Sequence, residues 1–202
     1  MRTASNTQQL IHERLLESIE VKKAILTNED LIELIQEVAL ACIHSLDRGG
    51  KIIFFGNGGS AADAQHLTAE LIGRYLRNRR ALAAIALTAN TSSLTAIAND
   101  YAYEDVFSRQ IEAIGCKGDV AIGISTSGNS KNVIRALLAA KKKALVTVGL
   151  TGSHGGELLH QASYCLCIPS QQTPRVQEAH IAVGHILCEI IEDHFSHAHN
   201  IS

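Results

Sequence analysis

The spacing of apolar residues changes near residue 50. Before it, they recur at helical intervals, with Leu15, Ile19 and either Ile25 or Leu26 on one face of a first stretch. A second helical stretch runs from about Asn28 to Leu46, and Gly49 and Gly50 follow it as a stop signal. Residues 1–50 therefore predict two amphipathic helices.

From residue 51 onward, short runs of consecutive apolar residues alternate with helical stretches. Runs that are apolar on both faces are typical of parallel strands covered by helices on two sides. The predicted strands are 51–55, 82–87, 119–124, 144–150 and 163–168. The predicted helices between and after them are 60–78, 104–115, 129–142, 156–161 and 174–195. This order predicts an α/β fold, a three-layer sandwich with a five-stranded, mostly parallel sheet plus N-terminal helices, which would pack on the sheet or on a neighbouring subunit.

Length and composition favour one enzyme-sized globular unit. The 202 residues fit a single domain, 1–202, with 1–50 as its N-terminal helical segment and 51–196 as the α/β core and C-terminal helix. The net charge of -2 gives no reason to expect nucleic acid as a partner, although Arg74, Arg77, Arg79 and Arg80 form one basic cluster. That cluster is typical of a solvated helix end or a site for a small anion.

Cysteine usage and hydropathy predict a cytoplasmic protein with no membrane partner. The chain has five cysteines, an odd number, and shows neither a signal peptide nor an apolar run of membrane-spanning length. Cys165 and Cys167 are two apart in a predicted strand and so face the same side. We interpret them as small core residues rather than half of a zinc knuckle.

Two loops that follow predicted strands carry groups suited to a phosphate. The first, "GNGGS", covers 56–60, with Ser60 expected as the helix N-cap and Asp63 three residues on. The second, "STSGNS", covers 125–130 and offers four hydroxyls before a helix start. Serine and threonine also cap turns in proteins without ligands. The matching positions of two such loops, at the carboxyl ends of strands, favour a phosphate site.

Two common nucleotide sites are excluded by spacing. The first loop loosely fits the dinucleotide fingerprint, but residues 82–93 lack the acidic residue that binds the ribose. No glycine is followed by Lys and then Ser or Thr, so there is no Walker-type loop. The phosphate therefore belongs to a metabolite.

Several side chains could move a proton or hold a metal. His66 and Glu70 are four apart on the helix that follows the first loop, a spacing that also occurs in simple helix-stabilising pairs. In the last helix, Gln177 lies roughly 60° from His180 and 80° from His185 around the axis. Either histidine could accompany Gln177.

Five segments together resemble one family. They are "GNGGSAADAQHLTAELIGRY", "LTAIAND", "GISTSGNSKNVI", "LTGSHGGEL" and "PRVQEAHIAVGHILCEII". The chain is similar along nearly its whole length to the phosphoheptose isomerases, which contain a sugar isomerase (SIS) domain. The resemblance implies an aldose-ketose isomerase that converts sedoheptulose 7-phosphate to D-glycero-D-manno-heptose 7-phosphate through an enediol, for ADP-heptose and the lipopolysaccharide core. It also implies a homotetramer whose sites are completed by neighbouring chains.

The resemblance assigns roles to matching positions. It implies a zinc ion held by His66, Glu70, Gln177 and His185, with Glu70 and His185 as the catalytic proton carriers. His180 would then be a bystander. Substrate contacts are implied for Asn57, Gly58, Gly59, Ser60, Glu70, Arg74, Asn99, Asp100, Ser125, Thr126, Ser127, Ser130 and Gln177. Some members have an acidic residue where this chain has Pro174, so a helper carboxylate is absent.

Two other functions share this domain. Binding-only proteins of the replication-initiator-associating type resemble the chain in "LTAIAND" and "QHLTAE", but they tend to lack the residues matching Glu70 and His185. Sugar-phosphate-sensing regulators carry a DNA-binding module, for which 202 residues leave no room. Because Glu70 and His185 are both present, we expect catalysis.

Overall fold

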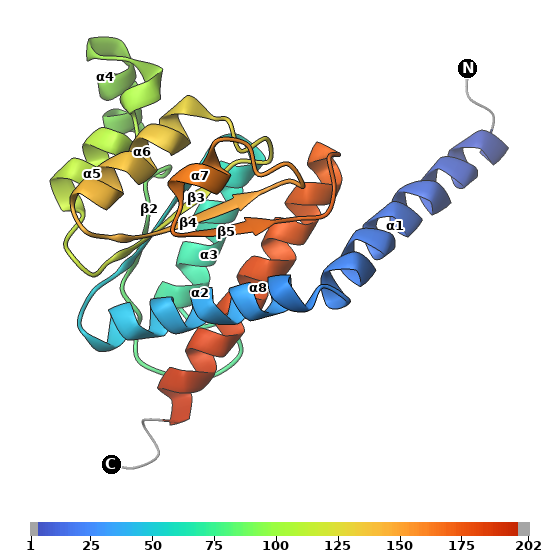
Figure 1. The fold of residues 1–202 in the computed structure, drawn as a ribbon, viewed down its shortest axis with the longest axis horizontal. Helices are drawn as coiled ribbons and strands as arrows, with labels where there is room; N and C mark the ends of the chain where they lie inside the picture. Colours follow the sequence, from blue (N-terminus) through green and yellow to red (C-terminus); the bar gives the residue numbers. More distant parts are fainter. Residues whose placement is uncertain (1–3, 198–202) are drawn as a thin grey trace.

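A computed structural model describes residues 4–197 (Figure 1). Helices and strands alternate along most of this part of the chain. The elements are α1 (Ala4–Leu26), α2 (Glu29–Asp47), β1 (Ile52–Gly56), α3 (Gly59–Ile72), β2 (Ala84–Ala86), α4 (Thr91–Asp100), the 3₁₀ turn η1 (Tyr103–Asp105), α5 (Ser108–Ile114), β3 (Val120–Ile124), α6 (Lys131–Lys142), β4 (Val146–Thr151), α7 (Leu158–Gln161), β5 (Tyr164–Cys167) and α8 (Thr173–His197).

The five strands form one sheet in the order β2-β1-β3-β4-β5. All four neighbouring pairs run parallel; Ile52 of β1, for example, lies opposite Ala84 of β2 and Val120 of β3. The predicted five-stranded parallel sheet is confirmed. Every strand ends at the same edge, so the loops that leave the strands gather there.

Alternate residues of each strand belong to two separate cores. Ile52 and Phe54 of β1 pack with α2, α3 and α8, whereas Ile53 and Phe55 pack with the α5, α6 and α7 side. Both faces of the strand are buried, which explains its uninterrupted apolar run. The three-layer α/β arrangement predicted from these runs is confirmed.

The two N-terminal helices pack differently. Leu31, Ile35 and Val38 of α2 are buried in the core, and the Asn28 side chain caps α2 by accepting a hydrogen bond from the Leu31 amide at 3.0 Å. In α1, Val21 and Ile25 near the C-terminal end are buried. The remainder of α1 extends away from the body (Figure 1). The sequence analysis left open whether these helices pack on the sheet or on a neighbouring subunit. In the structure, α2 covers the sheet, and most of α1 does not.

Two predicted helices need correction, and one helix was missed. The helix expected at 60–78 ends at Ile72, and the one expected at 104–115 is divided into η1 and α5. Helix α4 was not predicted. None of its residues is buried, so it shows no apolar stripe, and its only sequence signal is the cap formed by Asn90, which accepts a hydrogen bond from the Ser93 amide at 3.0 Å.

The segment after α3 is held by the carboxylate of Glu192 on α8. Glu192 is 1% exposed and accepts hydrogen bonds from the backbone amides of Tyr75, Leu76 and Arg77 at 2.7, 2.5 and 2.8 Å. The buried guanidinium of Arg79 lies 3.3 Å from the same carboxylate. Burial pushes the pKa of Glu192 up, but these hydrogen bonds and the Arg79 charge together hold it below its usual range.

Contacts near the same junction explain three of the four arginines in the basic cluster. Arg79 donates to the carbonyls of Glu70 and Leu71 and so caps α3, Arg77 pairs with Asp193, and the Arg80 guanidinium lies 4.6 Å from the centre of the Phe195 ring. These three arginines therefore stabilise the α3–α8 junction. None of the helices in the described range is long and apolar enough to cross a membrane.

Candidate active site

The first glycine loop connects β1 to α3 at the carboxyl edge of the sheet. Gly58, with φ of +57°, is the N-cap of α3, so its backbone takes a conformation that favours glycine. A Cβ on Gly59 would lie 2.5 Å from Nε2 of Gln177, so glycine here lets α8 approach the start of α3. The prediction that Ser60 caps the helix is wrong. Ser60 lies inside the first turn of α3 and is 3% exposed.

The second loop brings its serine hydroxyls together. Ser125 follows β3 and is 4% exposed; its Oγ lies 2.9 Å from Oγ of Ser130 and 3.4 Å from Oγ of Ser127. Ser130 is the N-cap residue of α6, yet its hydroxyl faces Ser125 and caps no helix amide. Ser127 is exposed, so the hydroxyl cluster opens to solvent at the start of a helix. An anion bound there would meet several donors and the positive end of α6.

Two asparagines join the loops. Asn57 Nδ2 donates to Asn132 Oδ1 at 2.9 Å, and Asn132 Nδ2 donates to Asn57 Oδ1 at 2.8 Å. Tyr103 of η1 donates its hydroxyl to the same Asn57 oxygen at 2.9 Å. Asn132 is 3% exposed, and its Oδ1 also accepts a hydrogen bond from the Val133 N–H, which fixes the orientation of its side-chain amide. Asn57, a predicted substrate contact, is therefore held by Asn132 and Tyr103, which sequence reasoning missed.

A His-Glu-His cluster lies between α3 and α8. Nε2 of His66 is 3.2 Å from Oε1 of Glu70 and 2.9 Å from Nε2 of His185. One ligand atom from each of the three residues can be chosen so that all lie within 4.8 Å of one another. The described residues contain no other such group of three or more His, Cys, Asp or Glu side chains. The sequence predicted the first pair from its helical spacing, and the fold adds His185 from 115 residues further along.

The choice between His180 and His185, the two candidate ligands on α8, follows from where they point. His180 is 1% exposed, and its Nε2 is 3.2 Å from the Thr151 carbonyl on the sheet side. Burial lowers its pKa to about 4, although the hydrogen bond with Thr151 opposes the shift. His180 is therefore a neutral core residue. His185 joins the cluster, and the Tyr75 ring stacks on it with the ring centres 5.4 Å apart.

Gln177 and Asp63 lie on the same two helices as the cluster. Gln177 is on α8 two turns before His185, and its amide lies against Gly59. Asp63 is on α3 one turn before His66, and its Oδ2 is buried with no hydrogen-bond partner in the described structure. Burial raises the pKa of the Asp63 carboxyl, and the His66 charge opposes this. Sequence reasoning treated Asp63 only as a capping residue.

Three predicted substrate contacts lie apart from the loops. Asn99 and Asp100 end helix α4 and are exposed, with Asn99 Nδ2 donating to Asp100 Oδ1 at 2.8 Å. Figure 1 shows α4 projecting on the α5–α6 side of the sheet. Arg74 follows α3 and donates to Asn78 Oδ1 at 3.3 Å. These three side chains are exposed, and none of them hydrogen-bonds to the His-Glu-His cluster or to the serine loop.

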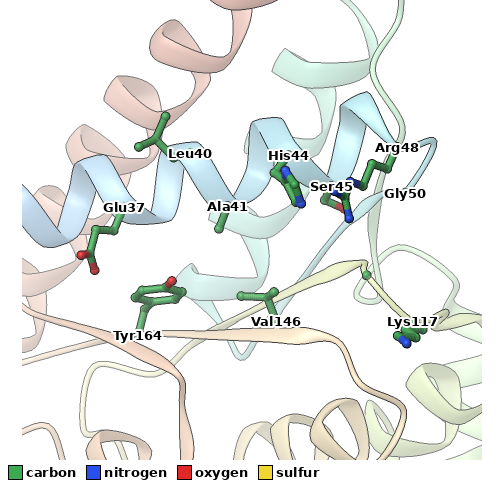
Figure 2. A pocket seen from close by; sticks show the side chains of 11 residues that line it. Glu37, Leu40, Ala41, His44, Ser45, Arg48, Gly50, Lys117, Val146 and Tyr164 are labelled. Carbon is green, nitrogen blue, oxygen red and sulfur yellow. The ribbon is translucent and has the colours of Figure 1, made fainter.

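A cavity of about 710 Å³ lies at the other end of the molecule. Figure 2 shows it between α2 and the sheet, with Tyr164 and Val146 facing Ala41 of α2. Gly50 and Gly118, which precede β1 and β3, complete one end of it. The cavity therefore opens at the amino ends of the strands, away from the two loops. Its lining lacks the convergent hydroxyls and the His-Glu-His group, so we place the chemistry at the carboxyl edge.

Comparisons with known proteins give consistent matches. A family model described as "SIS domain" matches residues 17–152. The phosphoheptose isomerase of Sulfurimonas denitrificans is 54% identical over 186 residues, which cover 92% of this chain and 95% of that protein. Phosphoheptose isomerase 2 of Campylobacter jejuni is 50% identical over 188 residues, covering 93% and 94%. The solved phosphoheptose isomerase GmhA from Neisseria gonorrhoeae superposes with a TM-score of 0.87 at 42% identity, covering 93% of this chain and 99% of that one.

Proposed function

This chain belongs to the phosphoheptose isomerases of the SIS domain family, and from that premise we propose that it interconverts sedoheptulose 7-phosphate and D-glycero-D-manno-heptose 7-phosphate. The relatives are about as long as this chain, so the proposal concerns a whole catalytic unit. The reaction moves a hydrogen between C1 and C2 of the sugar through an enediol. It therefore needs a group that carries a proton between carbons and a group that serves the two oxygens.

The observation that carries the proposal is the cluster of Glu70 with His66 and His185. A binding-only protein needs the phosphate loop but has no need for a carboxylate and an imidazole side by side. Here, Oε1 of Glu70 is 3.2 Å from His66, which is itself 2.9 Å from His185. This arrangement supports catalysis over the binding-only alternative.

The donor set of this cluster fits zinc. Two imidazole nitrogens and a carboxylate oxygen within 4.8 Å of one another are ligands that Zn²⁺ prefers, and catalytic zinc sites commonly have three protein ligands and an open position. We propose that His66, Glu70 and His185 hold one zinc ion per subunit, with Gln177 as a further ligand. When bound, the ion would polarise the carbonyl and hydroxyl oxygens of the sugar.

In the proposed mechanism, Glu70 takes the proton from the carbon beside the carbonyl and returns it to the neighbouring carbon. His185 donates a proton to the carbonyl oxygen and accepts one from the adjacent hydroxyl, so the enediol forms and collapses without net loss of protons. A nearby cation lowers the basicity of a carboxylate, so the two oxygens of Glu70 must divide ligation and proton transfer between them. We propose that one oxygen of Glu70 ligates the ion and the other carries the proton.

The phosphate end of the substrate would bind at the serine loop. Ser125, Thr126, Ser127 and Ser130 would donate to the phosphate oxygens, as would the amides at the start of α6. Asn57, Gly58, Gly59 and Ser60 would contact the sugar from the first loop. Binding at these remote atoms supplies energy that orients the reacting carbons. Arg74, which follows α3, and Asn99 and Asp100, which end α4, remain proposed substrate contacts.

We also propose a homotetramer with sites at subunit interfaces. Large apolar side chains of α1 are exposed, with Ile11 at 54%, Leu15 at 59% and Leu16 at 57%, and further exposed apolar residues lie on α8. A single chain leaves them in water, and association would bury them. Light scattering at micromolar concentration tests this, and a mass near the 21.7 kDa of one chain would exclude it.

Other expectations remain predictions. These are one domain over residues 1–202, a cytoplasmic location, and a product that enters ADP-heptose and lipopolysaccharide core synthesis.

The decisive experiment compares wild type with Glu70→Gln. Glutamine preserves size but cannot carry a proton at neutral pH, so turnover of sedoheptulose 7-phosphate should fall at least about 100-fold. The matched control is Glu37→Gln at the cavity of Figure 2, which should keep full turnover. If zinc-loaded wild type binds the sugar phosphate without converting it, the chain is a binding protein. If Glu70→Gln retains wild-type turnover, another residue carries the proton.

A further inference from the structure

A pair of thiols lies on the edge strand β5, away from the His-Glu-His cluster. Cys165 and Cys167 are both free and partly exposed, and their sulfur atoms are 3.9 Å apart. They are two residues apart in an extended strand, so both project from the same face of the sheet. Cys165 packs against the core cluster on the α6–α7 side of the sheet, so the pair lies on that face of the edge strand β5.

The sulfur separation matches that of a bidentate thiolate site. With a Zn–S bond of about 2.3 Å and a tetrahedral angle, two ligating sulfurs lie about 3.8 Å apart. The observed 3.9 Å needs almost no rearrangement to reach that value. We propose that Cys165 and Cys167 chelate a thiophilic divalent cation such as Zn²⁺ or Cd²⁺ on this face of strand β5, as a second metal site distinct from the one proposed for catalysis.

A disulfide fits the same geometry poorly. Residues two apart in a strand have Cα atoms separated by about 6.4 to 6.8 Å, at the upper limit for a disulfide, and their Cβ atoms point in parallel. A disulfide needs Cβ atoms about 3.5 to 4.5 Å apart, so forming one would distort β5 and its parallel pairing with β4. A bridging cation spans the gap without that distortion.

The thiols are also chemically suited to a soft cation. Their shared hydrogen bond lowers the pKa of Cys167 to about 7, although burial opposes this, and it raises the pKa of Cys165. Thiolates are the ligating form, so the proton of Cys165 and any remaining on Cys167 pass to water as the cation binds. No third His, Cys, Asp or Glu within the described residues completes a cluster with this pair, so water fills the remaining positions. An open two-thiolate site favours reversible binding over a structural role.

Cadmium titration of the chelator-treated full-length chain tests the proposal. Cd²⁺ bound to thiolate gives an ultraviolet charge-transfer band, which histidine and carboxylate ligands do not produce. In a Cys116→Ser background, which removes the one exposed cysteine, we expect the band to saturate at about one equivalent per chain. Cys165→Ser and Cys167→Ser should each abolish it, whereas His66→Ala should retain it. A band that persists in the Cys165→Ser/Cys167→Ser double variant, or no band in the parent, overturns the proposal.

A second measurement uses the unaltered chain and so does not depend on how the serine variants fold. Alkylation with iodoacetamide, followed by peptide mapping, reports the modification of each cysteine with and without Cd²⁺. We expect at least a tenfold slower modification of Cys165 and Cys167 with Cd²⁺, and an unchanged rate at Cys116. If Cys165 and Cys167 are each modified as fast with Cd²⁺ as without it, the proposal is overturned. Neither readout uses turnover, so these results test the thiolate site independently of the proposed isomerase activity.

Discussion

Nε2 of His66 lies 2.9 Å from Nε2 of His185, although 119 residues separate them in the chain. At this distance, two charged imidazolium rings would place like charges and two N–H groups against each other. At least one ring must therefore present a lone pair, which is the form that binds a metal. The approach of α3 to α8 thus places two imidazole nitrogens beside Glu70.

The first prediction concerns this pair. His66→Ala removes one of the proposed ligands, so zinc affinity should fall more than about 100-fold, beyond the usual effect of changes outside the ligand shell. Competition with a chromophoric chelator measures the affinity. His44→Ala, at the exposed face of α2, is the matched control and should bind zinc as wild type does. Unchanged zinc affinity in His66→Ala would contradict the proposed ligand set.

The second prediction concerns Asn132 as a positioning residue for Asn57. Asn132→Ala removes two hydrogen bonds to Asn57, so kcat/KM should fall by about tenfold to a hundredfold, corresponding to roughly 1.5 to 3 kcal/mol. Tyr103→Phe removes one bond to the same oxygen and should have a smaller effect. A purely structural role would lower thermal stability and zinc affinity as well. We expect zinc affinity to remain, and a loss of zinc together with activity would refute the positioning role.

The third prediction concerns the junction of α3 and α8. Glu192→Gln leaves Arg79 without its charged partner and gives the three backbone amides a weaker acceptor, so the free energy of unfolding should fall by about 3 kcal/mol. Urea unfolding measures the change. Asp193→Asn, at the neighbouring exposed position, should cost less than about 1 kcal/mol. Equal losses in the two variants would mean that the buried contacts of Glu192 contribute little.

The sheet could be predicted because its short apolar runs alternate with helical stretches along the chain. Strands such as Ile52–Gly56 are buried on both faces, a pattern typical of a parallel sheet between two helix layers. The His66–Glu70 pair was visible for a similar reason, since both residues lie on one helix. The position of His185 could not be obtained from periodicity, because it depends on how α8 crosses α3. In the sequence analysis, only the family resemblance selected it over His180.

Other features carried too little local signal. Helix α4 buries nothing, so its residues show no apolar period, and the Asn90 cap alone did not reveal it. Ser60 looked like a cap because serine often is one, but the positive φ of Gly58 places the cap two residues earlier. The contacts of Asn57 with Asn132 and Tyr103 join segments far apart in the chain. No rule based on neighbouring residues can predict such contacts.

His180 links the stability of the fold to pH. Its ring is 1% exposed, Nε2 contacts the Thr151 carbonyl, and Nδ1 is buried with no partner in the described structure. Burial lowers its pKa from 6.5 to about 4, so the folded state excludes a proton that the unfolded state binds readily. Between these two values the unfolded chain binds more protons, and stability must fall as the pH falls.

The last prediction measures this effect. From pH 7 to pH 5, His180 alone should lower the free energy of unfolding by about 2 kcal/mol, with little further loss below about pH 4. Gln at position 180 cannot titrate but can still donate a hydrogen bond to Thr151. The free energy of unfolding of wild type, measured relative to that of His180→Gln, should therefore be about 2 kcal/mol lower at pH 5 than at pH 7. Urea unfolding of metal-free protein at both pH values gives the comparison, with His44→Gln as the exposed control. If wild type and His180→Gln lose stability in parallel, His180 is not the titrating group.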